Sequence, residues 1–157
     1  MKEIKEITRK FINYLEAKGY AEKGVSEESS LFTKQYTVDF NTYLQDIIIE
    51  TEGAIRTVYC RPRVPDLPQG MIFVETNNTL DEAGWGIRSN ADILIQEVGD
   101  SLFQINFKAL QNLVKQRNPN EDFPTWIPVD GPRGKYVLGW VFELAPLIEE
   151  GIARKLA

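Results

Sequence analysis

Four carboxylates fall within one short stretch of the chain that contains no lysine or arginine. They are Asp39, Asp46, Glu50 and Glu52, and a fifth acid, Glu75, ends a later apolar run. Carboxylates that meet at strand ends can hold one or two Mg²⁺ or Mn²⁺ ions and activate water for phosphodiester hydrolysis. Acids in such places are also commonly solvated or paired with cations, and the spacing alone leaves both interpretations open.

Four arginines form the opposite set. Arg56, Arg61 and Arg63 lie in a window without acids, and Arg88 lies in a predicted loop. Guanidinium groups placed this way could contact the phosphates of a nucleic acid. They could equally neutralise the acidic window on neighbouring strands.

The chain has no histidine and a single cysteine, and both facts restrict the chemistry that it can perform. The 157 residues include no histidine, which excludes a Ser-His-Asp triad and zinc sites built on imidazole. A bound metal would therefore be a hard cation on oxygen ligands, with Mg²⁺ or Mn²⁺ the natural candidates. The single cysteine, Cys60, excludes an internal disulfide, and its apolar surroundings predict a buried structural thiol.

Length and composition indicate one domain, residues 1–157, with a sizeable core. Net charge is −5 and the pI is near 4.9, which argues against a generic basic nucleic-acid binder but leaves room for a local basic patch. No stretch approaches the roughly 18 apolar residues of a membrane span. We expect a cytoplasmic protein that does not contact a membrane.

The apolar periodicity predicts three helices and seven strands. The helices are 2–18, 107–117 and 146–155. The strands are 31–40, 46–50, 54–60, 71–76, 91–98, 101–107 and 135–142. Segments 61–70 and 118–135 are rich in proline and are predicted to be loops. This order predicts an α/β (α+β) fold in which helices flank a central mixed β-sheet.

Short signals support several of these boundaries. Glu52-Gly53 and Gly99-Asp100 are typical of hairpin turns, and Asn106 is a suitable N-cap for the second helix. Between strands 71–76 and 91–98 runs a long polar segment that places Trp85 between two glycines. We predict that Trp85 is buried beneath this loop.

The segment from residue 71 to the second helix resembles a known family. A strand ends in Glu75, Gly84-Trp85 follows, and Ser89-Asn90-Ala91-Asp92 leads into an apolar strand, a hairpin and a capped helix. This succession is similar to small phage-type proteins of the PD-(D/E)XK nuclease-like superfamily. The closing stretch KYVLGWVFELAPL and the opening helix, ending at Gly19-Tyr20, are also similar, so that the resemblance covers most of 2–24 and 46–150.

The resemblance implies a restriction-endonuclease-like fold and Mg²⁺-dependent cleavage of DNA. In that family an aspartate at a strand start and the acid of a Glu-x-Lys motif on the next strand hold the metal, and the lysine orients the attacking water. Asp46 matches the aspartate. We predict that Arg56-Thr57-Val58 stands in place of Glu-x-Lys. Glu75 supplies an acid on a later strand, with Asn77 where the lysine would be.

Two functional hypotheses follow. The first is a divergent metal-dependent DNA endonuclease, with Asp46 and Glu75 catalytic and Asp46, Glu50 and Glu75 on Mg²⁺ or Mn²⁺. The second is a non-catalytic relative, which contacts DNA or acts as a protein-binding inhibitor or adaptor. In both, the candidate nucleic-acid contacts are Arg56, Arg61, Arg63 and Arg88. Mimicry of DNA by an acidic surface is disfavoured, because a net charge of −5 is mild for that role.

Overall fold

The computed structural model describes residues 3–23, 34–65, 67–78, 80, 82–117, 125–128 and 136–157. The main sheet has the strand order β1 (Ala21–Glu22), β2 (Gln35–Val38), β3 (Ile47–Thr51), β4 (Ala54–Arg61), β6 (Ile93–Val98), β7 (Ser101–Asn106), β10 (Ala153–Lys155). A smaller sheet has the order β5 (Met71–Asn77), β9 (Tyr136–Glu143), β8 (Thr125–Pro128). The helices are α1 (Glu6–Ala17), α2 (Trp85–Arg88), α3 (Phe107–Gln116) and α4 (Leu144–Glu149).

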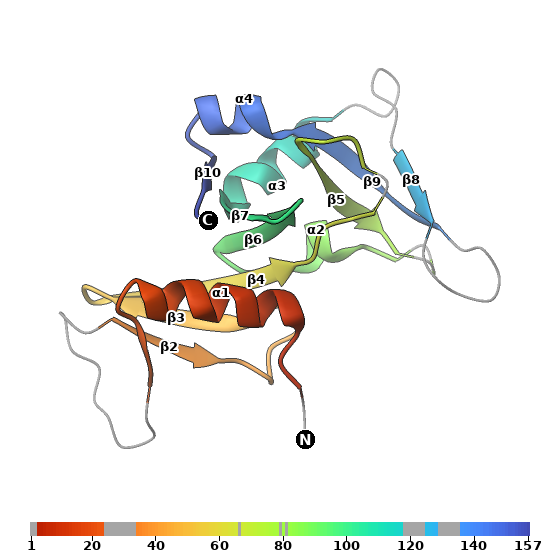
Figure 1. The fold of residues 1–157 in the computed structure, drawn as a ribbon. Coiled ribbons are helices and arrows are strands. Elements are labelled where there is room, and N and C mark those ends of the chain that lie inside the picture. Colours follow the sequence, from red (N-terminus) through yellow and green to blue (C-terminus); the bar gives the residue numbers. More distant parts are fainter. Residues whose placement is uncertain are drawn as a thin grey trace.

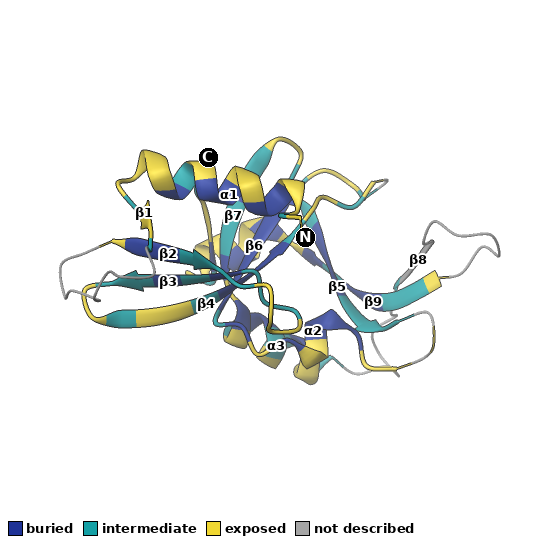
Figure 2. Ribbon diagram, turned by 90° about the horizontal axis from the view of Figure 1, so that it is seen from below, coloured by how far each residue is buried: buried dark blue, intermediate teal, exposed yellow. Residues whose placement is uncertain are grey.

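The main sheet is mixed. Its neighbouring strands are antiparallel except β1 with β2 and β4 with β6, which are parallel. Strand β4 reaches its parallel neighbour β6 only after the chain has passed through β5 and α2 (Figure 1). Helix α1 covers one face of the sheet, and α2 and α3 lie on the other (Figure 2). The predicted class, a mixed sheet flanked by helices, is therefore confirmed.

Two apolar cores lie on the two faces of the main sheet, because successive strand residues point to opposite sides. On β4, Val58 and Cys60 belong to the core beneath α1, whereas Tyr59 belongs to the other core. On β6, Ile95 and Leu94 divide in the same way. The second core also holds the inward side chains of the small sheet, together with those of α3 and α4.

The ends of α1 and α3 follow the signals in the sequence. Gly19 has a φ of 93°, and the Tyr20 N–H donates to the Leu15 carbonyl at 2.9 Å, which closes α1 with a left-handed residue. The side chain of Asn106 accepts a hydrogen bond from the Ala109 N–H and caps α3.

Both predicted hairpins are present. Glu52 and Gly53 have positive φ angles of 51° and 75° between β3 and β4, and Gly99 turns the chain between β6 and β7. Positive φ at both central residues suits the twist of a two-residue hairpin.

Strand 71–76 is confirmed as β5, which pairs with β9 in the smaller sheet. Two other predicted segments differ from the structure. The predicted loop 118–135 contains β8, and the remainder of that segment lies outside the described residues. Within the described part of the predicted strand 31–40, which begins at residue 34, the strand is β2, and Phe40 beyond its end is exposed.

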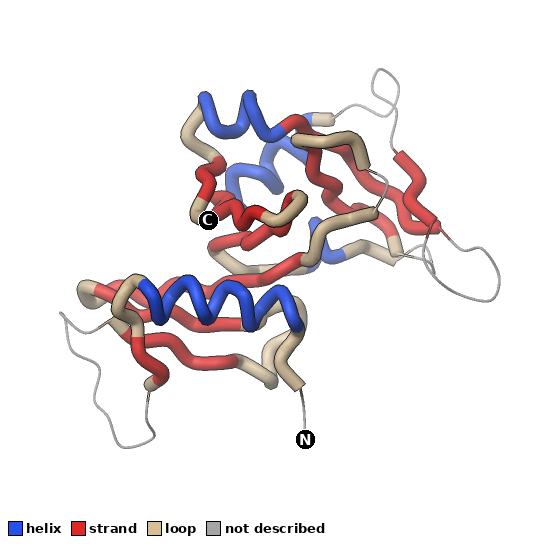
Figure 3. The backbone as a smooth tube through the Cα atoms, in the orientation of Figure 1, coloured by secondary structure: helices blue, strands red, loops and turns tan. Residues whose placement is uncertain are grey.

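The chain end also differs from the prediction. The helix expected over 146–155 is α4, which ends at Glu149, and Gly151 turns the chain into β10 (Figure 3). Strand β10 pairs with β7 and forms an edge of the main sheet, and Ile148 of α4 is exposed. A backbone ladder with β7 satisfies the polar groups of this segment, which a propensity argument for helix does not consider.

Candidate functional site

Asp46 lies immediately before β3, and its carboxylate already has two partners. Oδ2 accepts the Cys60 N–H at 2.8 Å and pairs with Lys5 Nζ at 2.9 Å. Lys5 precedes α1, and its Nζ also donates to the Cys60 carbonyl at 2.8 Å. The ammonium group therefore neutralises the aspartate and ties the start of α1 to the end of β4.

Strand register shows which residues of β4 lie beside Asp46. Ile47 pairs with Val58, and the Asp46 N–H donates to the Val58 carbonyl at 2.7 Å. The predicted counterpart of Glu-x-Lys, 56–58, is thus displaced, because Arg56 pairs with Ile49 further along the ladder.

On β4, Tyr59 follows Val58 directly and Arg61 stands two residues after Tyr59. This is the spacing of the Glu-x-Lys motif. Residues two apart on a strand share a face. Under the motif that the resemblance implies, Tyr59 would stand at the place of the acid and Arg61 at the place of the lysine.

Arg61 is held by aromatic rings. Its Cζ lies 5.0 Å from the centre of the Trp85 ring and 6.0 Å from that of Tyr59, and Nη1 donates to Tyr59 Oη at 3.3 Å. Lys5 Nζ lies 4.8 Å from the centre of the Tyr59 ring. Burial raises the pKa of Tyr59 above its usual value, although the positive charge of Arg61 opposes this shift. The phenol therefore stays neutral and cannot replace a metal-binding carboxylate.

Glu75 approaches the same tyrosine from β5 of the smaller sheet. Its Oε2 accepts the Trp85 N–H at 3.0 Å, so that this carboxylate caps the start of α2. The charges of Asp46 and Glu75 both contribute to the raised pKa of Tyr59. Both predicted acids therefore lie close enough to this buried phenol for their charges to act on it.

Glu50 does not join them. It lies near the far end of β3, four residues from Asp46, which corresponds to roughly 13 Å along a strand. Its Oε1 pairs with Lys23 Nζ at 2.9 Å. A cation that binds Asp46 is therefore out of reach of Glu50.

The donor set does not fit a magnesium ion. Mg²⁺ requires several oxygen ligands in near-octahedral geometry, whereas Asp46 faces an ammonium group and the neighbouring strand presents a phenol and a guanidinium. Within the described ranges, no three acidic or cysteine side chains are arranged to hold a metal ion.

The remaining predicted arginines lie in different surroundings. Arg63 donates to Asp100 at 3.2 Å and to the Gly99 carbonyl at 3.1 Å. Arg88, at the end of α2, lies 5.0 Å from the centre of the exposed Tyr43 ring. Arg56 is exposed near the start of β4 and is considered below.

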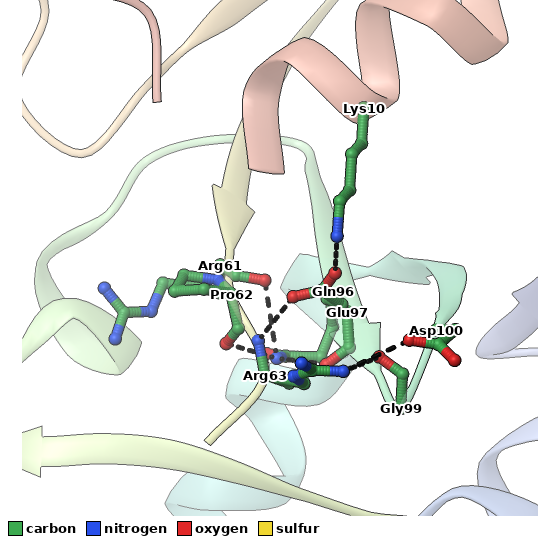
Figure 4. A network of polar contacts seen from close by, with 8 residues as sticks. All are labelled: Lys10, Arg61, Pro62, Arg63, Gln96, Glu97, Gly99 and Asp100. Atoms are coloured by element: carbon green, nitrogen blue, oxygen red, sulfur yellow. Dashed lines mark hydrogen bonds and ion pairs between the residues drawn. The ribbon is translucent and has the colours of Figure 1, made fainter. Parts of the chain in front are cut away.

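A second polar network surrounds Glu97, a buried acid that the sequence did not single out (Figure 4). Lys10 of α1 donates to Oε2, and the Arg63 N–H donates to Oε1 at 3.2 Å. Burial alone would raise the pKa of this carboxyl, but the hydrogen bonds from Lys10 and Arg63 outweigh it and hold the pKa below its usual range. Gln96 next to it donates to the carbonyls of Pro62 and Glu97.

Two predictions about buried residues are confirmed. Cys60 is fully buried, and burial raises the pKa of its thiol to about 12. Trp85 is buried, in contact with Tyr59 and Phe107. Two functional-site residues, Lys5 and Tyr59, were missed; the Tyr59-x-Arg61 spacing was the available signal.

Comparisons of the chain with protein-family models, with curated proteins and with solved structures find no match. None of the helices in the described residues is long and apolar enough to cross a membrane.

Proposed function

We propose that this protein is a nuclease-like DNA-binding protein that does not cut DNA. The observation that carries the proposal is the group around Asp46, in which Lys5 neutralises the aspartate and Tyr59 and Arg61 occupy the acid and lysine positions of the next strand. A fixed guanidinium disfavours a divalent cation at the same place but attracts a phosphate. The DNA partner itself follows from the resemblance of residues 46–150 to nuclease-like proteins.

The side chains around this group suit a nucleic acid. Arg61 lies over the ring of Trp85, the first residue of α2. Arg88, the last residue of α2, lies over the ring of Tyr43. Arginines beside aromatic rings can contact phosphates while the rings stack on unpaired bases. Tyr43 has 68% of its surface exposed, so it is available for stacking.

Cleavage and binding should be measured separately. Plasmid and single-stranded DNA incubated with the protein in Mg²⁺ and in Mn²⁺ should remain intact, and calorimetry should detect no tight uptake of Mn²⁺. Fluorescence anisotropy with labelled single-stranded and duplex DNA should detect binding. Metal-dependent cleavage that disappears in the Asp46→Ala, Glu75→Ala double variant would instead establish the endonuclease hypothesis.

Substitution of Arg61 tests the contact. Arg61→Gln should weaken DNA binding on the order of tenfold, or about 1.4 kcal/mol, because a charged phosphate donor is lost. Arg63→Gln is the matched control, because Arg63 already pairs with Asp100 and lies beside Glu97. Equal affinities of the two variants would remove Arg61 from the interface.

A rebuilt motif tests the relation to nucleases. Tyr59→Glu combined with Arg61→Lys places Asp, Glu and Lys at the positions that the family uses. We expect this variant to gain affinity for Mn²⁺ by calorimetry, whereas Arg61→Lys alone gains none. Circular dichroism shows whether the double variant folds; a folded variant that gains no affinity for Mn²⁺ would contradict the nuclease-like geometry of the site.

The alternative is a protein-binding module. The observation that favours it is the exposure of two large apolar side chains beside Arg88, namely Tyr43, whose ring Arg88 faces, and the preceding residue Ile87. A protein partner held by these groups would bind with little dependence on salt, whereas DNA binding weakens steeply as salt rises.

A further inference from the structure

A second cationic surface lies away from the Asp46 group. A groove of about 970 Å³ opens where β4 and β6 begin, beside the start of α3 and the turn from α4 into β10. Arg56, Lys108 and Arg154 line it. A smaller hollow of about 240 Å³ between α2 and α3 shares Lys108 and adds Lys115. We call these four residues together the cationic face.

The positive charge of the cationic face is not compensated by acids. Asp92 is the single acid among the described side chains that line either hollow. Its Oδ2 accepts hydrogen bonds from the N–H and the hydroxyl of Thr57, at 3.0 and 3.2 Å, and it pairs with none of the four cations. The face therefore carries net positive charge on a protein whose total charge is −5.

Neutral groups hold two of these cations in place. Lys108 Nζ donates to the Asn90 carbonyl at 3.1 Å, and Arg154 Nη2 donates to Gln104 Oε1 at 3.2 Å. All four side chains are exposed, and none forms an ion pair with another residue in the described ranges. By contrast, Lys5, Lys10, Lys23 and Arg63 are each paired with a carboxylate.

The remaining lining of the two hollows is rich in amides. Asn106 lines the larger hollow, and Asn90, Gln111 and Asn112 line the smaller one. Amide groups and lysines that alternate along a surface can follow a repeating anionic chain, because each phosphate accepts hydrogen bonds from either kind of donor. Helix α3 separates two stretches of this surface, with Lys108 at its start and Lys115 in its last turn.

We propose that the cationic face binds the phosphate backbone of a nucleic acid, as a contact surface separate from the group around Arg61. That the anion is a nucleic acid rests on the proposed function. The location of the contact rests on Arg56, Lys108, Lys115 and Arg154. Contacts to phosphates position a nucleic acid without reading its sequence. This face therefore adds affinity and salt dependence rather than specificity.

The test compares two variants with the same change of net charge. The first replaces Arg56, Lys108, Lys115 and Arg154 by glutamine. The control replaces by glutamine four exposed cations that line neither hollow, namely Arg9, Lys18, Lys34 and Lys155. Anisotropy titrations with duplex and single-stranded DNA between about 50 and 200 mM salt give the affinity and its salt slope.

We expect the first variant to bind on the order of 100-fold more weakly at low salt and to lose about 3 from the log–log salt slope, because each phosphate contact contributes about 0.7–0.9. The control should keep most of its affinity and slope. Equal losses in the two variants would mean that net charge alone matters, and would overturn the assignment of the face.

The outcomes separate this inference from the proposed function. If the unaltered protein binds DNA and the first variant binds equally well, the cationic face is not the contact and the proposed function stands. If the first variant loses binding while Arg61→Gln does not, the face stands and the Arg61 contact fails. If the unaltered protein binds no DNA, both fail.

Discussion

At the level of single residues, two lysines of the N-terminal segment each form an ion pair with a carboxylate of the main sheet region. Lys5 pairs with Asp46, and Lys10 pairs with Glu97. Each of these acids also accepts a backbone N–H, from Cys60 and from Arg63 respectively. An acid that is partly withdrawn from water keeps its charge only if donors surround it. These two carboxylates are therefore anchors for α1 against the main sheet.

The Glu97 anchor predicts a pH-dependent stability. The pKa of Glu97 lies below its usual 4.5 in the folded protein, so its contribution is fully present above about pH 4.5 and is lost as the pH falls through the folded value. We expect Glu97→Gln to lower the free energy of unfolding at pH 7 by about 1–3 kcal/mol, the usual value of hydrogen bonds to a charged group. Urea unfolding at several pH values measures this.

The difference between Glu97→Gln and the unaltered protein should shrink as the pH is lowered towards the folded pKa of Glu97. Glu143→Gln, at the exposed end of β9, is the control and should leave the stability unchanged at every pH. A difference for Glu97→Gln that stays constant with pH would show that packing, and not the ionised carboxylate, stabilises this site.

At the level of elements, α2 depends on glycines on both sides of Trp85. A Cβ atom at Gly86 would overlap the Val74 side chain and the Glu75 carbonyl, and one at Gly84 would overlap the Glu75 side chain. The backbone of this short helix therefore lies directly against β5. This close approach places the Trp85 N–H on Glu75 and the Trp85 ring beside Arg61.

Gly86→Ala should consequently destabilise the fold by about 1–3 kcal/mol, because an extra methyl group in a filled contact forces the backbone apart. Gly151→Ala is the comparison: nothing lies within 4 Å of its Cβ position, but its φ is 75°, so only backbone strain opposes the change. We expect a loss of about 1 kcal/mol there. Chemical denaturation gives both changes in the free energy of unfolding. Only Gly86→Ala should also change the near-UV circular dichroism signal of Trp85.

At the level of the whole molecule, the two cores share the strands that separate them. Residues of β4 alternate between the core beneath α1 and the core beneath α3, as do those of β6. Loss of packing on one face of these strands would therefore also remove support from the core on the other face. We therefore expect the two cores to unfold together, and the single domain over 1–157 stays a prediction.

Core truncations test that unity. Phe11→Ala in one core and Leu110→Ala in the other should each lower the free energy of unfolding by about 2–5 kcal/mol, since both side chains are fully buried. In both variants, probes of α1 and of α3 should report one common transition, because the shared strands couple the cores. Two separated transitions would show that the halves fold independently.

A large part of the fold followed from local pattern. The stripe of α1, the cap at Asn106 and the turns at Glu52-Gly53 and Gly99 act between residues close in sequence, so their signals are readable in the chain. Strand partners depend on residues far apart, and for this reason β10 was missed and the division of the strands into two sheets was not predicted.

The sequence by itself determined which reactive groups the chain has: acids and arginines, no histidine, and one buried thiol. It also predicted the mixed sheet with its flanking helices. Only the tertiary structure decided that Asp46 pairs with Lys5, that Arg61 donates to Tyr59 on the neighbouring strand, and that Glu50 stays apart. The physical reason is register. A shift of a few residues along one ladder exchanges which side chains are neighbours, and that shift is set by packing over the entire sheet.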